Sequence, residues 1–283
     1  MNIKAIPKLI RFEHGLMLSL AVLISIFLTV SEINWGNKVY ILLALPFLIE
    51  AGAFALNDFF DVETDTINRK NRPIVKGEIS KESAFIIGSG SLFIAIILSL
   101  LTENLLIINL TGFFAFFSVL YNWKLKDMPL MGNIYIGFSM AIPFLFGNLA
   151  FSNSIVPENF ILFSMAFIVG VSREIIKTVE DYKGDRKARG SKTLPFYIGE
   201  KKSLMFAGSL IGVFILLGIY SFTMLKFSIF SGLLWLAALM YYMYLCFSII
   251  YTKETLNFKS IKRYTLITMF LGLIAVLLTK FSI

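Results

Sequence analysis

Apolar runs of about 20 residues, the length that crosses the hydrocarbon core of a bilayer, recur along this chain and limit its fold more than any other feature. The chain is 57% hydrophobic and only 16% charged, whereas about 25% of the residues in a soluble domain are charged. We therefore predict an all-α, polytopic membrane protein. Nine spans are expected, at residues 14–32, 39–57, 83–101, 104–121, 131–151, 159–179, 203–222, 227–250 and 264–281.

The basic residues predict how these spans are oriented. Of the 26 lysines and arginines, 23 fall on one side of the predicted membrane, and the other side keeps only Lys38, Lys226 and Lys280. By the positive-inside rule, the amino terminus is cytoplasmic and the carboxyl terminus lies outside the cell membrane. The net charge of +8 is then explained by this topology and by contact with anionic lipid headgroups. Nothing in the sequence indicates a nucleic-acid partner or a protein partner.

Histidine and cysteine are too scarce for most metal sites. The chain has one cysteine, Cys246, in an apolar run, and one histidine, His14. Neither a disulfide framework nor a multi-histidine site can form, so any metal ion must be held by oxygen atoms, which favours magnesium, calcium or manganese.

The first polar cluster is the stretch "LNDFFDVETDTINRKNRP", residues 56–73, directly after the second predicted span. Asn57, Asp61 and Asp65 recur every four residues, and Asp58 precedes Asp61 by three, so a helix would place these side chains along one face. Glu50 lies seven residues before Asn57, deeper in the span. An ionisable residue at that depth is a functional candidate, although a protonated or hydrogen-bonded Glu50 with a purely structural role is the alternative.

The second cluster follows the sixth predicted span. Glu174, Lys177, Asp181 and Asp185 recur at spacings of three and four, a pattern that ion pairs along one helix would also explain. Both clusters are placed in cytoplasmic loops, 58–82 and 180–202, with an even number of spans between them. We therefore predict a single domain, 1–283, built of two parallel repeats, about 1–125 and 126–250, plus a final helix, with the acidic clusters facing each other across a cavity.

Such closely spaced carboxylates repel one another, and divalent cations relieve that repulsion. Magnesium is usually bound by a few carboxylates together with substrate phosphates, so two Mg²⁺ ions holding a diphosphate are expected here. The nearby basic residues would clamp that diphosphate. These candidates are Arg69, Arg72, Lys76, Lys124, Lys126 and Lys192.

Three segments resemble motifs of the UbiA superfamily of intramembrane prenyltransferases. "NDFFDVETD" matches its NDxxDxxxD motif, "DYKGD" followed by "RKARGSKTLP" resembles its second aspartate motif, and "YNWKLK" resembles its tyrosine-and-lysine segment. The resemblance covers the whole chain. It implies a ring of nine helices around a central cavity, with cytoplasmic cap loops and an opening toward the lipid.

The resemblance also implies roles for individual residues. Asn57, Asp61, Asp181 and Asp185 would hold Mg²⁺, with Asp58 and Asp65 assisting, and Asp61, Asp181 and Asp185 are the candidates for catalysis. The residues expected to contact the diphosphate are Arg72, Tyr121 and Lys126.

The segment "REIIKTVEDYKGD" is most similar to the archaeal branch of the superfamily, which builds ether lipids. That likeness implies transfer of a geranylgeranyl group from geranylgeranyl diphosphate to the glycerol hydroxyl of geranylgeranylglyceryl phosphate. The acceptor is a lipid-like molecule that carries a phosphate. The candidate acceptor-binding residues are Arg173, Lys177, Glu50, Lys76 and His14.

Three other functions are the alternatives to this one. Within the superfamily, an aromatic quinone precursor is the alternative acceptor. A cation transporter would account for Glu50 but leaves the basic loops unexplained. A CDP-alcohol phosphatidyltransferase is also magnesium-dependent and rich in aspartate, but its single-segment motif is absent here.

Overall fold

The computed structural model describes residues 2–68, 70–251 and 256–281, and every regular element among them is helical. A short amino-terminal segment, η1 (Ile3–Ala5) and α1 (Ile6–Leu9), leads into the first long helix. The long helices are α2 (Phe12–Thr29), α3 (Asn37–Phe60), α5 (Lys81–Leu100), α6 (Leu105–Trp123), α9 (Pro157–Arg189), α10 (Leu194–Tyr220), α11 (Ile229–Tyr251) and α12 (Phe258–Thr279). The short elements between them are α4 (Val62–Ile67), η2 (Leu125–Asp127), α7 (Met131–Ala141), α8 (Pro143–Leu149) and η3 (Ser221–Thr223).

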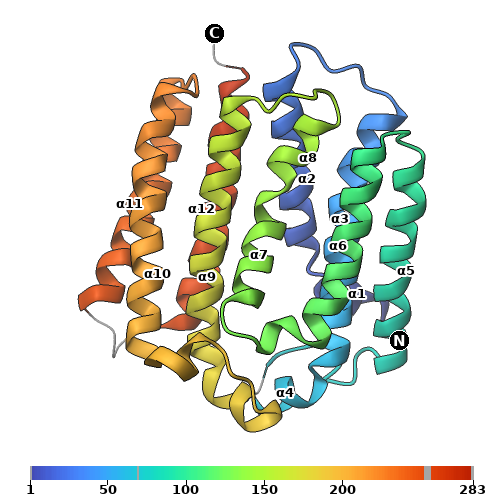
Figure 1. Ribbon diagram of the computed structural model, residues 1–283, viewed down its shortest axis with the longest axis vertical. Helices are drawn as coiled ribbons and strands as arrows, with labels where there is room; N and C mark the ends of the chain where they lie inside the picture. Colours follow the sequence, from blue (N-terminus) through green and yellow to red (C-terminus); the bar gives the residue numbers. More distant parts are fainter. Residues whose placement is uncertain (1, 69, 252–255, 282–283) are drawn as a thin grey trace.

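Within the described ranges, eight helices are long and apolar enough to cross a membrane, which confirms the predicted class of fold. The fifth predicted span, 131–151, is not one continuous helix. Pro143 begins α8 directly after α7 ends, because proline cannot donate the backbone hydrogen bond that would continue the first helix. The two short helices follow one another along the height of the bundle, between α9 and α6 (Figure 1).

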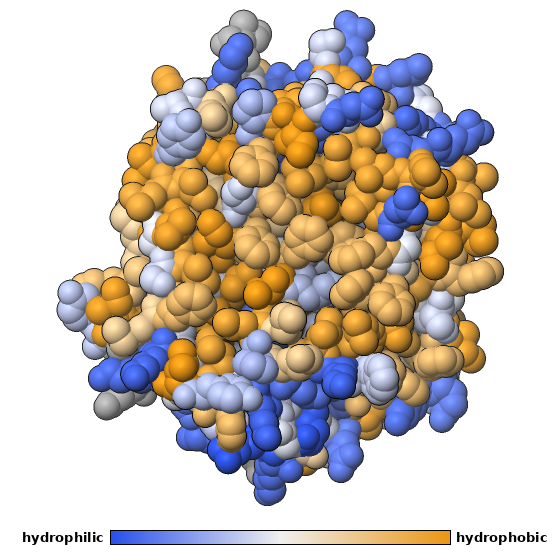
Figure 2. All heavy atoms as spheres, in the orientation of Figure 1, coloured by the Kyte–Doolittle hydropathy of each residue, from blue (hydrophilic) through white to orange (hydrophobic). Residues whose placement is uncertain are grey.

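The helices stand side by side and give the molecule two polar ends. Apolar side chains cover the middle of the visible surface, and hydrophilic side chains gather above and below them, as a lipid-embedded protein requires (Figure 2). The amino and carboxyl termini lie near opposite ends (Figure 1). The end that carries the amino terminus also holds α4 and the last turns of α9.

Small residues allow some neighbouring helices to approach closely. At the contact of α7 and α9, a Cβ atom added to Gly170 would lie 3.0 Å from the Cα of Gly137. Close backbone contact of this kind stabilises helix pairs in lipid, where the hydrophobic effect does not drive one helix against another. This packing holds α9, which carries the second acidic cluster, against the centre of the bundle.

Candidate active site

The first acidic cluster lies where α3 gives way to α4. The helix ends at Phe60, and Asp61 adopts a φ of −98° and a ψ of 8°, which separates the two helices. The helical hydrogen bonds nevertheless continue, from Asp61 N to Asn57 O at 2.9 Å and from Asp65 N to Asp61 O at 2.7 Å. Asn57, Asp61 and Asp65 therefore still follow one another along the same wall of a polar cavity, as their spacing predicted.

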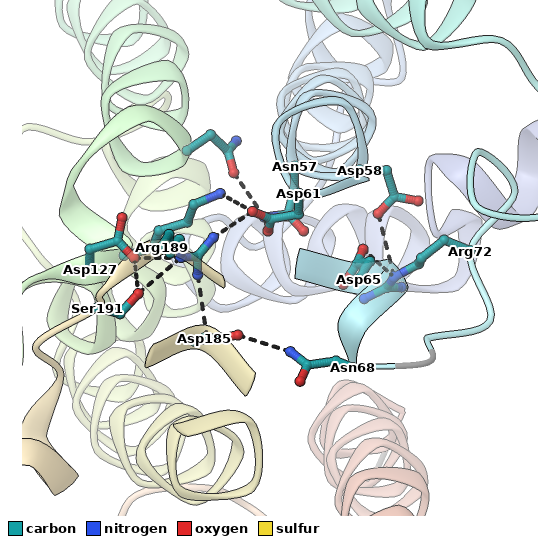
Figure 3. Close-up of polar contacts among 12 residues, drawn as sticks. Asn57, Asp58, Asp61, Asp65, Asn68, Arg72, Asp127, Asp185, Arg189 and Ser191 are labelled. Atoms are coloured by element: carbon teal, nitrogen blue, oxygen red, sulfur yellow. Dashed lines mark hydrogen bonds and ion pairs between the residues drawn. The ribbon is translucent and has the colours of Figure 1, made fainter. Parts of the chain in front are cut away.

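Asp58 points away from this cavity. Its carboxylate is 1% exposed and lies 3.2 Å from Arg11 Nη2 and 3.6 Å from Arg72 Nε. Figure 3 shows Asp58 on the side of α3 opposite the contact between Asp61 and Arg189. Asp58 thus ties the start of α2 and the segment after α4 to the end of α3.

The second cluster lies on a helix, although the sequence predicted a loop over 180–202. The helix α9 continues through Arg189 and stops at Gly190, whose φ of 69° suits a glycine that ends a helix. Polar residues lower the hydropathy of this segment but do not prevent a helix, and the basic side chains in its last turn favour one. Asp181 and Asp185 consequently lie on consecutive turns of a rigid element.

Glycine lets the two clusters approach each other. Gly184, between the two aspartates of α9, faces Asn68 at the end of α4, and an added Cβ would lie only 1.5 Å from Asn68 Oδ1. Asn68 Nδ2 donates a hydrogen bond to Asp185 Oδ1 at 3.0 Å, which links the two halves of the site.

Arg189 is the central cation of the site. Its guanidinium lies 2.6 Å from Asp61 Oδ1, 2.6 Å from Asp127 Oδ1 and 3.3 Å from Asp185 Oδ2, as Figure 3 shows. The planar fork of arginine donors makes such multiple pairing possible. Lys126 Nζ lies 2.5 Å from Asp61 Oδ1, so two cations share that carboxylate.

These pairs shift the protonation equilibria of the groups outside the membrane spans. Burial by itself would raise the pKa of Asp61, but Lys126 and Arg189 together lower it. Burial lowers the pKa of Lys126 despite its pair with Asp61. Burial also raises the pKa of Asp65, although Arg72 Nε lies 3.4 Å from its Oδ2.

The side chains described above enclose a polar cavity of about 60 Å³, called here the charged cavity. Nine predicted site residues line it: Asn57, Asp61, Asp65, Arg72, Tyr121, Lys126, Lys177, Asp181 and Asp185. Sequence reasoning missed Asn68, Lys70 and Arg189, although Lys70 forms an ion pair with Asp181. The spacing of four between Asp185 and Arg189 was the available signal for the last of these.

Other predicted residues lie elsewhere. Lys76, Lys124 and Lys192 are exposed and do not line the charged cavity, and Arg69 falls outside the described residues. His14, Glu50 and Arg173 line an apolar cavity of about 110 Å³ between α2, α9, α11 and α12. Glu50 also lines a second apolar cavity, of about 40 Å³, between α3 and α6.

The oxygen atoms of the charged cavity suit a hard cation such as Mg²⁺. Asp65 Oδ2 is buried without a hydrogen-bond donor from the described part of the chain. Asn57 donates from its amide nitrogen to Asp61 and to Asn122, both at 2.9 Å. Among the described residues, however, no three acidic, histidine or cysteine side chains converge on one point. Lysine and arginine occupy the positions between the carboxylates, so a metal ion would have to replace some of these ion pairs.

The fold and the site together define a multi-pass membrane protein with a charged cavity at the end of its bundle and apolar cavities deeper inside. The UbiA prenyltransferase family model matches residues 18–274, so the chain belongs to this family and is a prenyltransferase. The predicted family is thereby confirmed.

Among curated proteins, a digeranylgeranylglyceryl phosphate synthase of Archaeoglobus fulgidus is 35% identical over 206 residues, which cover 72% of this chain and 70% of that protein. The synthase of the same name from Methanothrix thermoacetophila is 41% identical over 172 residues, 60% of this chain and 62% of that protein.

Solved structures share the fold across nearly the whole chain. One, from work on digeranylgeranylglyceryl phosphate synthase in membranes, superimposes with a TM-score of 0.72 at 28% identity and covers 99% of this chain and 98% of that one. A UbiA homologue from Archaeoglobus fulgidus, bound to DMAPP and Mg²⁺, superimposes with a TM-score of 0.71 at 19% identity and covers 99% and 100%.

Proposed function

We propose that this prenyltransferase transfers a geranylgeranyl group from geranylgeranyl diphosphate to the glycerol hydroxyl of geranylgeranylglyceryl phosphate and releases diphosphate. The names of the archaeal relatives supply the substrate class. The observation that carries the proposal is the arrangement of a charged cavity beside apolar cavities. The donor and the acceptor each combine a phosphate-bearing head with a long isoprenoid chain. The heads suit the charged cavity, and the chains suit the apolar cavities.

The charge of the cavity supports a role for magnesium. Its described lining contains five acidic residues, Asp61, Asp65, Glu174, Asp181 and Asp185, and five basic ones, Lys70, Arg72, Lys126, Lys177 and Arg189. These charges balance, so a diphosphate would add several uncompensated negative charges to a site of low hydration. Divalent cations would compensate these charges. The structure of the UbiA homologue from Archaeoglobus fulgidus is described as bound to DMAPP and Mg²⁺. We expect two ions, held by Asn57, Asp61, Asp65, Asp181 and Asp185.

Magnesium would supply stabilisation of the charge that develops on the leaving diphosphate. The basic residues of the chain act on the same charge. When the donor binds, Lys126, Arg189 and Lys70 exchange their carboxylate partners for diphosphate oxygens, where charge-assisted hydrogen bonds hold the leaving group in place. The apolar cavities below keep water from the allylic carbon until the acceptor attacks it.

The acceptor phosphate would bind to Arg173 and Lys177, one turn apart on α9. Within the described residues, Arg173 donates one hydrogen bond, from Nε to Thr265 Oγ1 at 3.3 Å. Lys177 lies 2.8 Å from Glu174 and lines the charged cavity, whereas Arg173 lines the larger apolar cavity. The pair therefore spans the boundary between the two environments, where the head of a lipid acceptor belongs.

The experiment is a transfer assay with the purified protein and radiolabelled geranylgeranyl diphosphate. Geranylgeranylglyceryl phosphate, its phosphate-free analogue and 4-hydroxybenzoate are compared as acceptors, each with and without magnesium. We expect magnesium-dependent product with the first acceptor only. Product with the aromatic acceptor instead would indicate a quinone-type prenyltransferase, and equal use of the phosphate-free analogue would contradict the phosphate site.

A further inference from the structure

Besides Thr268 on α12, four polar side chains interrupt the apolar lining of the 110 Å³ cavity, each from a different helix. They are His14 on α2, Glu50 on α3, Arg173 on α9 and Tyr242 on α11. On every one of these helices, the named residue is the lining residue nearest the charged cavity in helix order. The four therefore form a polar rim, which separates the charged cavity from the apolar interior.

The rim has unused hydrogen-bonding capacity. Tyr242 is 2% exposed, and its hydroxyl has no hydrogen-bond partner among the residues that the structure describes. Glu50 forms no hydrogen bond or ion pair with any other described residue. Leaving a buried polar group unsatisfied is costly, so this rim is suited to a ligand that brings both a donor and an acceptor.

Glu50 also occupies a special position between cavities. It and Leu18 line both the 110 Å³ cavity and the 40 Å³ cavity, and Glu50 is the residue of α3 nearest Asp61 in either lining. The proposed reaction brings two isoprenoid chains into one protein, and each of the two cavities offers apolar surface to such a chain. The heads of both chains would then meet at Glu50.

The depth of Glu50 fits the geometry of an in-line displacement. It precedes Asn57 by seven residues on one helix, which corresponds to about 10 Å along the axis. A diphosphate at Asn57 and Asp61 would direct its allylic carbon toward the apolar cavities. The attacking hydroxyl approaches that carbon from the side opposite the diphosphate, so its proton is turned toward Glu50 and away from the leaving group.

We infer that the carboxylate of Glu50 accepts the proton of the acceptor hydroxyl during transfer; this inference rests on the proposed function. The bond between the allylic carbon and the diphosphate oxygen breaks, and its electron pair leaves with diphosphate. The hydroxyl oxygen forms the new ether bond to that carbon, and its proton passes to Glu50. The proton returns to water when the products leave.

His14 is the competing proton acceptor in the rim. Its ring packs edge-on against Phe54 at 5.2 Å, and it shares the cavity with Arg173 and follows Arg11 by three residues. A protonated imidazole would be repelled by these arginines, whereas the same cations favour a carboxylate at Glu50. The charges around the two side chains thus favour Glu50 over His14 as the acceptor of the hydroxyl proton.

The test compares alcohol and thiol acceptors in the full-length protein. Glu50→Gln keeps the size of the side chain but cannot accept the proton, and removal of a general base lowers rates by about 10²–10⁴-fold. A thiol is a far stronger acid than an alcohol, as the pKa of about 8.5 of a cysteine thiol illustrates, so the 2-thiol analogue of geranylgeranylglyceryl phosphate depends much less on a base. We expect the variant to lose transfer to the alcohol, to use the thiol at close to the wild-type rate, and still to release diphosphate from the donor alone.

Matched variants separate the alternatives. Tyr242→Phe should weaken acceptor binding equally for alcohol and thiol. The inference is overturned if Glu50→Gln transfers normally to the alcohol, if alcohol and thiol are impaired alike, or if His14→Gln shows the selective loss instead. Failure of the wild type to use geranylgeranylglyceryl phosphate would instead overturn the proposed function, and the assignment of Glu50 with it.

Discussion

Gly184→Ala is the most informative single substitution, because it adds one carbon atom where the two acidic clusters meet. The new Cβ would lie 1.5 Å from Asn68 Oδ1 and 2.5 Å from its Cγ, whereas real contacts of a Cβ are essentially never shorter than 3.0 Å. The side chain of Asn68 must therefore withdraw by roughly the length of a covalent bond, which breaks its 3.0 Å hydrogen bond to Asp185.

The expected effects on stability and on activity differ. Loss of a hydrogen bond to a charged group costs about 1.5–3 kcal/mol, and replacing glycine by alanine inside a helix returns about 1 kcal/mol. The net loss in the free energy of unfolding should thus be about 0.5–2 kcal/mol. A displacement of about 1 Å in a catalytic arrangement can lower the rate about 10²-fold, so kcat/KM for the donor should fall by about 10–100-fold.

Three further variants make this prediction specific. Gly112→Ala, in α6, meets no atom within 4 Å of the added Cβ and should leave activity unchanged. Asn68→Ala removes the side chain that collides, so Gly184→Ala should have little further effect in that background. Transfer rates and thermal unfolding are measured for all four variants and for the wild type. Full activity of Gly184→Ala, or additive losses in the double variant, would refute the contact between the two clusters.

The remaining predictions concern metal, acceptor and topology. Asp61→Ala and Asp185→Ala should each lower transfer by about 10²–10³-fold or more, as chelation of Mg²⁺ should in the wild type, and near-normal activity of either variant would contradict a shared diphosphate site. Lys177→Met should raise the KM of the acceptor by about 10–100-fold with little change for the donor, whereas Lys183→Met, exposed on the same helix, should change neither. A cysteine introduced at exposed Ser80, in a cysteine-free background, should resist impermeant labelling reagents in intact cells; efficient labelling would reverse the predicted orientation.

The fold could be predicted because the membrane leaves few options. A segment in lipid must satisfy its own backbone hydrogen bonds, so run length and hydropathy are enough to locate most spans. The same rule fails for a helix that leaves the membrane. Residues 180–189 are polar, which predicts a loop, yet α9 extends through them without interruption. Run length alone also predicts one span over 131–151, whereas Pro143 divides that stretch into α7 and α8.

The acidic half of the site could be predicted better than the basic half. The aspartates follow helical spacing, which the local sequence reveals. Tertiary contacts, in contrast, decide which lysines and arginines reach the site. Lys124 and Lys126 are two residues apart, but the 3₁₀ turn η2 leaves the first exposed and directs the second to Asp61. Arg189 reaches Asp61 across 128 residues of sequence, a distance over which no spacing rule operates.

Asp58 shows why matching a motif does not by itself assign a ligand. It belongs to the same aspartate motif as Asp61, and a continuous helix would offset residues three apart by only about 60°. However, α3 ends at Phe60, and the non-helical backbone of Asp61 separates the two carboxylates. Asp61 faces the charged cavity, whereas Asp58 is buried against Arg11 and Arg72. A buried carboxylate needs such partners, because an unpaired one would be strongly destabilising. Since Arg72 also lies 3.4 Å from Asp65, the pairs of Asp58 hold in place the segment that carries the rest of the cluster. The motif thus encodes both the wall of the site and the contact that positions this wall.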